Sequence, residues 1–124
     1  MKFKFETVED ILTEMARIGI IDDYELYVRS KDGGNVPHIH IWDAETNGDK
    51  FHSCVRLDAP EYFHHTGKED VLNHKMKKEL IDFFNAPYRK YNITNWQHAV
   101  DLWNDNTSDI IIPEGYEMPD YNKL

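Results

Sequence analysis

The sequence contains a single cysteine, Cys54, among its 124 residues. One thiol cannot form a disulfide within the chain, so the fold does not require an oxidising compartment. Long apolar runs are also missing, since no segment approaches the roughly 20 residues that span a bilayer. Residues 1–10, MKFKFETVED, lack the apolar core of a secretory signal. We therefore expect a cytoplasmic protein that does not interact with a membrane.

Basic residues are scarce. The chain has 14 Lys and Arg against 23 Asp and Glu, which gives a formal net charge of −9. Such a charge repels phosphate backbones and argues against general nucleic-acid binding. The charge is uneven, because residues 101–124 hold six acids and one base, whereas residues 75–90 hold five bases and two acids. Such charge runs are usually exposed to solvent, here as a solvated helix face beside an acidic tail. Alternatively, the basic stretch binds an acidic partner, or the acids form a strip that imitates nucleic acid.

The length suits one domain, residues 1–124, and 40% apolar residues suffice for a core without disulfides. We divide it into a body, residues 1–109, and an extended acidic tail, residues 110–124. Three consecutive isoleucines, 110–112, followed by Pro113 and Pro119, indicate an extended segment that docks on the body.

Apolar periodicity predicts the elements. Spacings of three and four residues indicate helices over 8–18, over 74–84 with Asn73 as the N-cap, and from Thr94 or Asn95 to Trp103. Alternation predicts strands over 24–29, 37–42 and 51–57, with residues 71–72 as a candidate fourth. The order α-β-β-β-α-α, plus the tail, indicates an α+β fold. In it, a three-stranded or four-stranded antiparallel meander packs against about three helices.

Two histidines, His38 and His40, lie two residues apart on a predicted strand, so both side chains leave the same face. A two-residue turn at Asn47-Gly48 would pair position 40 with position 55. The histidine face would then be the core face, shared with Trp42 and with residues 51, 53, 55 and 57. Residues 39, 41, 52, 54 and 56 would lie on the opposite face, although a single β-bulge would reverse the assignment.

A His-x-His pair on a strand is suited to binding a divalent transition metal such as zinc. A third ligand would come from just beyond the sheet, where the candidates are Asp58, Glu61, His64 and His65. Alternatively, His38 and His40 could serve as catalytic acid and base, or could simply be half-buried and hydrogen-bonded to backbone. Cys54, in the middle of a strand, is expected to be a buried packing residue.

Asp32 followed by Pro37-His38-Ile39-His40-Ile41, and later Asn95-Trp96 at a helix start, resembles a family of small bacterial proteins of unknown function. The resemblance covers roughly residues 24–104. Members of that family often belong to gene pairs that look like toxin–antitoxin modules, which implies a genetic context more than a reaction. This chain departs from the family in having Val36 where a second proline is common, and in its acidic tail.

Three functions remain open at this level. The favoured one is a protein-interaction component of a toxin–antitoxin-like or phage–host conflict system, in keeping with the small size and the acidic tail. The second is a metal-dependent or histidine-based hydrolase, such as a nuclease, that uses His38 and His40. The third is an acidic mimic of nucleic acid.

Overall fold

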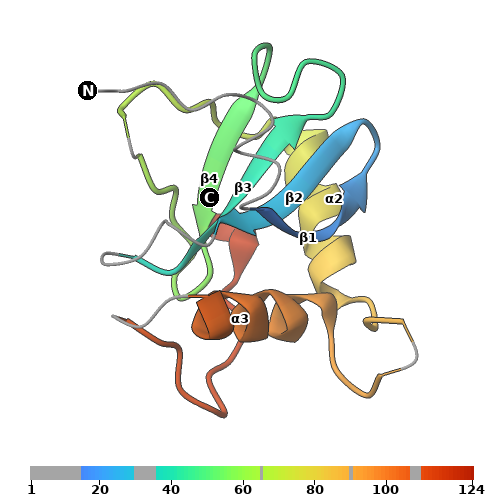
Figure 1. The fold of residues 1–124 in the computed structure, drawn as a ribbon, viewed down its shortest axis with the longest axis vertical. Coiled ribbons are helices and arrows are strands. Elements are labelled where there is room, and N and C mark those ends of the chain that lie inside the picture. Colours follow the sequence, from blue (N-terminus) through green and yellow to red (C-terminus); the bar gives the residue numbers. More distant parts are fainter. Residues whose placement is uncertain (1–14, 30–35, 65, 90, 107–109) are drawn as a thin grey trace.

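The computed structural model describes residues 15–29, 36–64, 66–89, 91–106 and 110–124. Four strands form one antiparallel sheet in the order β1-β2-β3-β4 (Figure 1): β1 Met15–Ile21, β2 Tyr24–Arg29, β3 His38–Asp43 and β4 His52–Arg56. Two α-helices follow, α2 His74–Asn85 and α3 Asn95–Asn106, and then a short 3₁₀ helix, η1 Tyr121–Lys123. The α+β class and the antiparallel meander are therefore confirmed.

The helix predicted over residues 8–18 is wrong in the part that the structure describes. Residues 15–18, expected to end a helix, begin β1, and residues 8–14 lie outside the described residues. A β-bulge between Arg17 and Gly19 explains the error. Because of this extra residue, Ile18 and Ile21 both reach the core although they are three residues apart, which is a helical spacing. The strand added to the three that the sequence predicts is therefore β1. Residues 71–72, the candidate for that additional strand, are not in a strand.

The β3–β4 connection sets the register of the sheet. His40 pairs with Cys54 and Ile41 with Ser53, one residue away from the predicted pairing. Asn47 and Gly48 do have positive φ angles, as the turn signal predicts. However, the Asp43 carboxylate accepts hydrogen bonds from the backbone N–H groups of Thr46, Lys50 and Phe51 at 2.8–3.2 Å. These bonds organise a loop over residues 44–51 in place of a two-residue turn.

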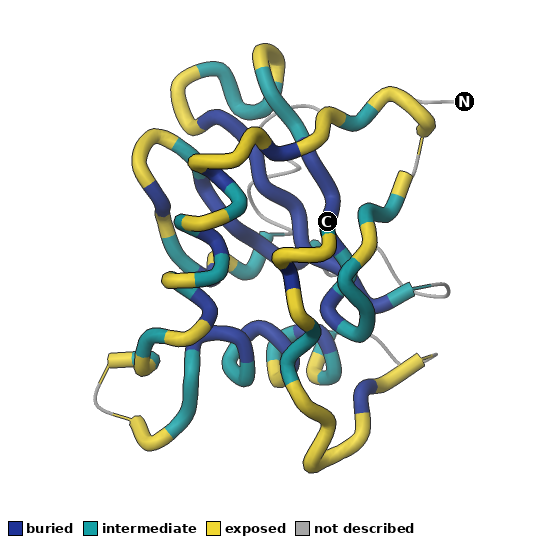
Figure 2. The backbone as a smooth tube through the Cα atoms, turned by 180° about the vertical axis from the view of Figure 1, so that it is seen from behind, coloured by how far each residue is buried: buried dark blue, intermediate teal, exposed yellow. Residues whose placement is uncertain are grey.

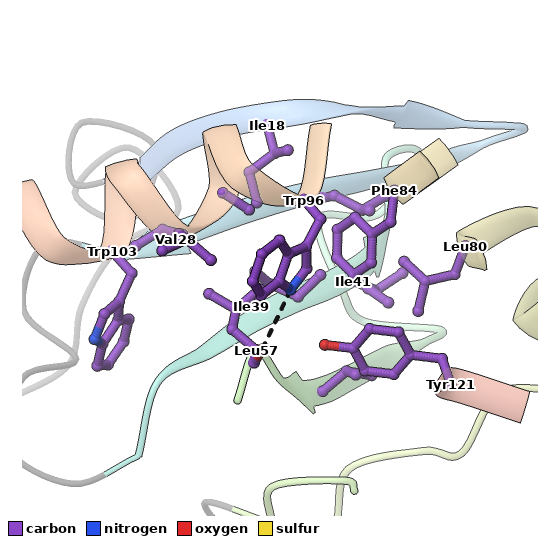
Figure 3. Packing of buried hydrophobic residues seen from close by; sticks show 14 of the residues in the cluster. Ile18, Val28, Ile39, Ile41, Leu57, Leu80, Phe84, Trp96, Trp103 and Tyr121 are labelled. Carbon is purple, nitrogen blue, oxygen red and sulfur yellow. Dashed lines mark hydrogen bonds between the residues drawn. The ribbon is translucent and has the colours of Figure 1, made fainter. Parts of the chain in front are cut away.

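The core lies between one face of the sheet and the two helices (Figure 3). Residues 26, 28, 39, 41, 55 and 57 contribute from the strands and from the residue after β4. α2 presents Met76, Leu80 and Phe84, and α3 presents Trp96, Ala99, Val100 and Trp103. The Asn73 side chain accepts from Met76 N, so the predicted N-cap is confirmed. The placement of His38 and His40 on the core face is wrong, because the shifted register puts them on the opposite one.

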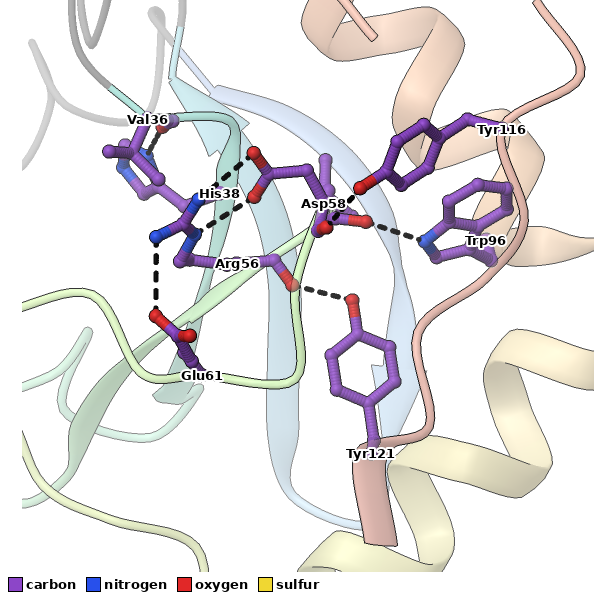
Figure 4. A network of polar contacts seen from close by, with 9 residues as sticks. Val36, His38, Arg56, Asp58, Glu61, Trp96, Tyr116 and Tyr121 are labelled. Carbon is purple, nitrogen blue, oxygen red and sulfur yellow. Dashed lines mark hydrogen bonds and ion pairs between the residues drawn. The ribbon is translucent and has the colours of Figure 1, made fainter. Parts of the chain in front are cut away.

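The C-terminal tail packs on the body through polar contacts (Figure 4). The Tyr121 hydroxyl donates to Arg56 O at 2.5 Å, and the Tyr116 hydroxyl donates to Asp58 O at 2.6 Å. Burial raises the pKa of Tyr121 well above its ordinary value, so the hydroxyl keeps its proton. Asp58 in turn binds the Arg56 guanidinium and raises its pKa. Tyr116 and Tyr121 thus connect the tail to the residues at the end of β4, and Ile112 and Tyr121 are buried in the core, whereas Ile110 and Ile111 are exposed.

Burial follows the strands and the inner sides of the helices, and exposed positions follow the loops and the tail (Figure 2). All six residues of β3 are buried, so this strand is covered on both faces. Among the described residues, neither helix is long and apolar enough to cross a membrane.

Candidate metal centre

Three side chains with metal-binding atoms meet on the sheet face opposite the helices: His40, His52 and Cys54. His40 Nδ1 lies 2.8 Å from His52 Nε2, and Cys54 Sγ lies 3.3 Å from His40 Nδ1. The third side of the triangle, from Cys54 Sγ to His52 Nε2, measures 3.9 Å. Two imidazole nitrogens and one sulfur therefore converge on a volume about the size of one ion.

The backbone of one hairpin positions these three side chains. His40 and Cys54 are directly paired across β3 and β4, so their side chains share a face. His52 lies two residues before Cys54 on the same strand and points to the same side. Its backbone N–H donates to Asp70 Oδ2 at 3.0 Å, and its carbonyl accepts from Asp70 N at 2.7 Å, which holds the outer edge of β4 in place.

Aromatic rings surround the cluster. The Tyr27 ring stacks on His40, with 4.9 Å between centroids and 10° between planes. Trp42 contacts both Tyr27 and His52. Its indole N–H donates to Glu25 Oε1 at 3.1 Å, and the other Glu25 oxygen pairs with Arg17. His40 and Cys54 are only 3% and 1% exposed, and His52 is half-buried.

His38 lies next to this cluster but is not one of its three members. Its ring centroid is 5.0 Å from that of His40, and it also contacts Phe63 and Trp103. A hydrogen bond of 2.6 Å joins His38 Nδ1 to Val36 O, with the ring nitrogen as the donor (Figure 4). His38 and His40 do share one face, as the two-residue spacing predicts.

The expected third ligands beyond the sheet lie elsewhere. Asp58 and Glu61 are ion-paired with Arg56, and His64 is exposed beside Tyr62. His65 lies outside the described residues. The cluster instead contains His52 and Cys54, which sequence reasoning placed on the other face. The spacing His-x-Cys on β4 repeats the spacing His-x-His on β3, and this repeat across a hairpin is the signal that could have identified them.

Comparison of the chain with protein-family models, with curated proteins and with solved structures found no match. The resemblance to the small bacterial family, with the genetic context it implies, therefore stays a prediction. The interaction, hydrolase and mimic hypotheses are likewise untested.

Proposed function

We propose that this protein binds one zinc ion through His40, His52 and Cys54. The observation that carries the proposal is the mutual approach of the three donor atoms, which all lie within 4.8 Å of one another. Two imidazoles and one thiolate form a donor set that suits zinc and other late first-row metals, and does not suit magnesium or calcium.

The triangle has nearly the size that zinc needs. With Zn–N of about 2.0 Å and Zn–S of about 2.3 Å, tetrahedral angles give about 3.3 Å between nitrogens and about 3.5 Å between nitrogen and sulfur. The observed separations are 2.8 Å between the nitrogens, and 3.3 and 3.9 Å from nitrogen to sulfur. Each atom therefore needs to move by no more than about half an ångström, which small side-chain rotations can supply.

The burial of the ligands supports a structural role for the ion. A substrate would have to reach a cluster in which two of the three side chains are almost fully covered. A buried ion, by contrast, cross-links β3 to β4 and contributes its binding free energy to folding. A reduced thiol as ligand also fits a cytoplasmic location, which we include in the proposal.

The test uses protein made without a histidine tag and loaded with zinc. We expect one zinc per chain by elemental analysis, and a stabilisation of about 2.7 kcal/mol at a free zinc concentration 100 times the Kd. With cobalt in place of zinc, we expect thiolate-to-metal charge-transfer absorption. His52→Ala should lose the metal, and His64→Ala, an exposed histidine outside the cluster, should keep it.

Cys54→Ser should lose the charge-transfer absorption, and Cys54→His should retain cobalt without it, which separates loss of a ligand from loss of the fold. Circular dichroism of each variant checks that the sheet and the helices persist. A wild-type chain that takes up no zinc, or a folded His52→Ala variant that binds zinc equally well, would overturn the proposal.

A further inference from the structure

A pocket of about 640 Å³ lies at the end of the sheet, where the β1–β2 turn meets the β3–β4 loop. The turn consists of Asp22 and Asp23, because Ile21 and Tyr24 are the last paired residues of the two strands. The Asp23 carbonyl accepts a hydrogen bond from Ala44 N at 2.8 Å, which ties the turn to the loop. The pocket walls are thus joined by backbone contacts and do not depend on the metal cluster.

The floor of the pocket is apolar. Tyr24 and Phe51 pack edge to face with 5.2 Å between ring centroids. Ile20 also lines the pocket and is 54% exposed, although it belongs to a strand. Preformed concave sites with apolar walls and a few polar groups are the usual form of a binding site, and about 640 Å³ falls within their ordinary size range.

The rim of the pocket carries an excess of negative charge. Asp22, Asp23 and Glu45 line it, together with one base, Lys50, which is already paired with Glu45 at 2.9 Å. On the other side of the same turn, a second pocket of about 510 Å³ adds Glu79. A hydrogen bond with Asp22 raises the pKa of Glu79, because the two carboxyl groups crowd together. Asp22 forms an ion pair with Lys75, with 3.7 Å between the carboxylate oxygen and Nζ.

We propose that this pocket binds a protein partner through a segment in which an arginine neighbours a large apolar side chain. The apolar side chain would cover Ile20 and Phe51, and the guanidinium would meet the carboxylates of Asp23 and Glu45. Arginine fits better than lysine, because its planar group can donate two parallel hydrogen bonds to one carboxylate. A simple polyamine would pair with the carboxylates of the rim but would leave the apolar floor exposed to water. A peptide can cover both, so the combination of floor and rim favours a peptide.

The experiment titrates the full chain, labelled with ¹⁵N, with an acetylated and amidated tetrapeptide of alternating leucine and arginine. We expect amide shifts at the β1–β2 turn and the β3–β4 loop, with an affinity that falls as salt is added. A leucine–glutamate tetrapeptide and spermidine serve as comparison ligands and should shift these amides much less. Zinc should leave the affinity unchanged, so this inference can fail while the metal proposal stands.

Three variants locate the contacts. Asp23→Asn and Ile20→Ser should each weaken peptide binding by about tenfold, since one removes a charge and the other an apolar wall. Asp105→Asn, an exposed position on α3 outside the pocket lining, should bind like the wild type. The proposal is overturned if the peptide leaves the pocket amides unshifted, if spermidine binds as tightly as the peptide, or if Asp23→Asn and Asp105→Asn weaken binding equally.

Discussion

Replacing Asp43 with asparagine should destabilise the protein at neutral pH and much less in acid. The side chain accepts from three backbone N–H groups and from the Thr46 hydroxyl at 2.5 Å, and the residue is only 8% exposed. Burial by itself would raise the pKa of Asp43, but the hydrogen bonds from Thr46, Phe51 and Lys50 outweigh it and lower the pKa from 3.8 to about 2.

The contribution of Asp43 to the free energy of unfolding, and its change with pH, follow from the difference between the pKa of the folded and the unfolded state. Each pKa unit corresponds to about 1.4 kcal/mol, so the lowered pKa corresponds to about 2.5 kcal/mol at neutral pH as an upper value, or about 1–2 kcal/mol with screening at the loop surface. Because the folded state has the lower pKa, the contribution is complete above about pH 5. It is lost as the pH falls through 3.8 towards 2. At pH 3 roughly half of it should remain.

Urea unfolding of the wild type and of Asp43→Asn, each at pH 7 and at pH 3, measures this contribution. We expect a gap in the free energy of unfolding of about 1–2 kcal/mol at pH 7 that narrows by about half at pH 3. Asp49→Asn, an exposed position in the same loop, is the matched control and should change little at either pH. A gap that stays constant between pH 7 and pH 3 would refute the role assigned to the ionised carboxylate.

Three further predictions test the packing, each by urea unfolding at pH 7. Gly19→Ala should lower the free energy of unfolding by about 1–3 kcal/mol, because the new Cβ would overlap the Phe83 ring. Phe83→Leu should recover part of this loss in the double variant. If the two substitutions instead destabilise the protein additively, the predicted overlap is wrong. Ser53→Ala should stabilise by about 1 kcal/mol, because its fully buried hydroxyl finds no partner among the described residues; a loss would show that the hydroxyl is bonded. Tyr121→Phe should lower the free energy of unfolding by about 1–2 kcal/mol, because the Arg56 carbonyl loses its hydrogen bond from the hydroxyl. An unchanged free energy of unfolding would mean that this tail contact does not stabilise the fold.

The three strands and the two α-helices after residue 23 could be predicted from the sequence because their signals are local, although the candidate strand at residues 71–72 does not form. Alternation in residues 24–29 and the Asn73 cap each depend on neighbours a few positions away, and both predictions are confirmed. β1 could not be predicted in the same way. Its bulge gives Ile18 and Ile21 a helical spacing on a strand, and Gly19 beside the bulge lies against Phe83 in α2, which is far along the chain.

The candidate site could be predicted in part. Period-two geometry places His38 and His40 on one face, as observed. Which residues of β4 join them depends on the register of β3 and β4, and the loop held by the hydrogen bonds of Asp43 shifts that register by one residue. A one-residue shift moves His52 and Cys54 from one face to the other. The Asn47-Gly48 turn signal does not indicate that the Asp43 side chain will organise a longer loop, so the register could not be read from it.

All three proposed ligands lie within the 19 residues of one hairpin, from His38 to Arg56. Bringing them together requires the closure of one short loop, and the entropic cost of closing a loop grows slowly with its length. None of the donors comes from α2, α3 or the tail, which follow later in the chain. During synthesis, the hairpin leaves the ribosome before those segments do. If the proposed zinc site is real, the hairpin would therefore hold its full set of ligands before the helices are available to pack on it.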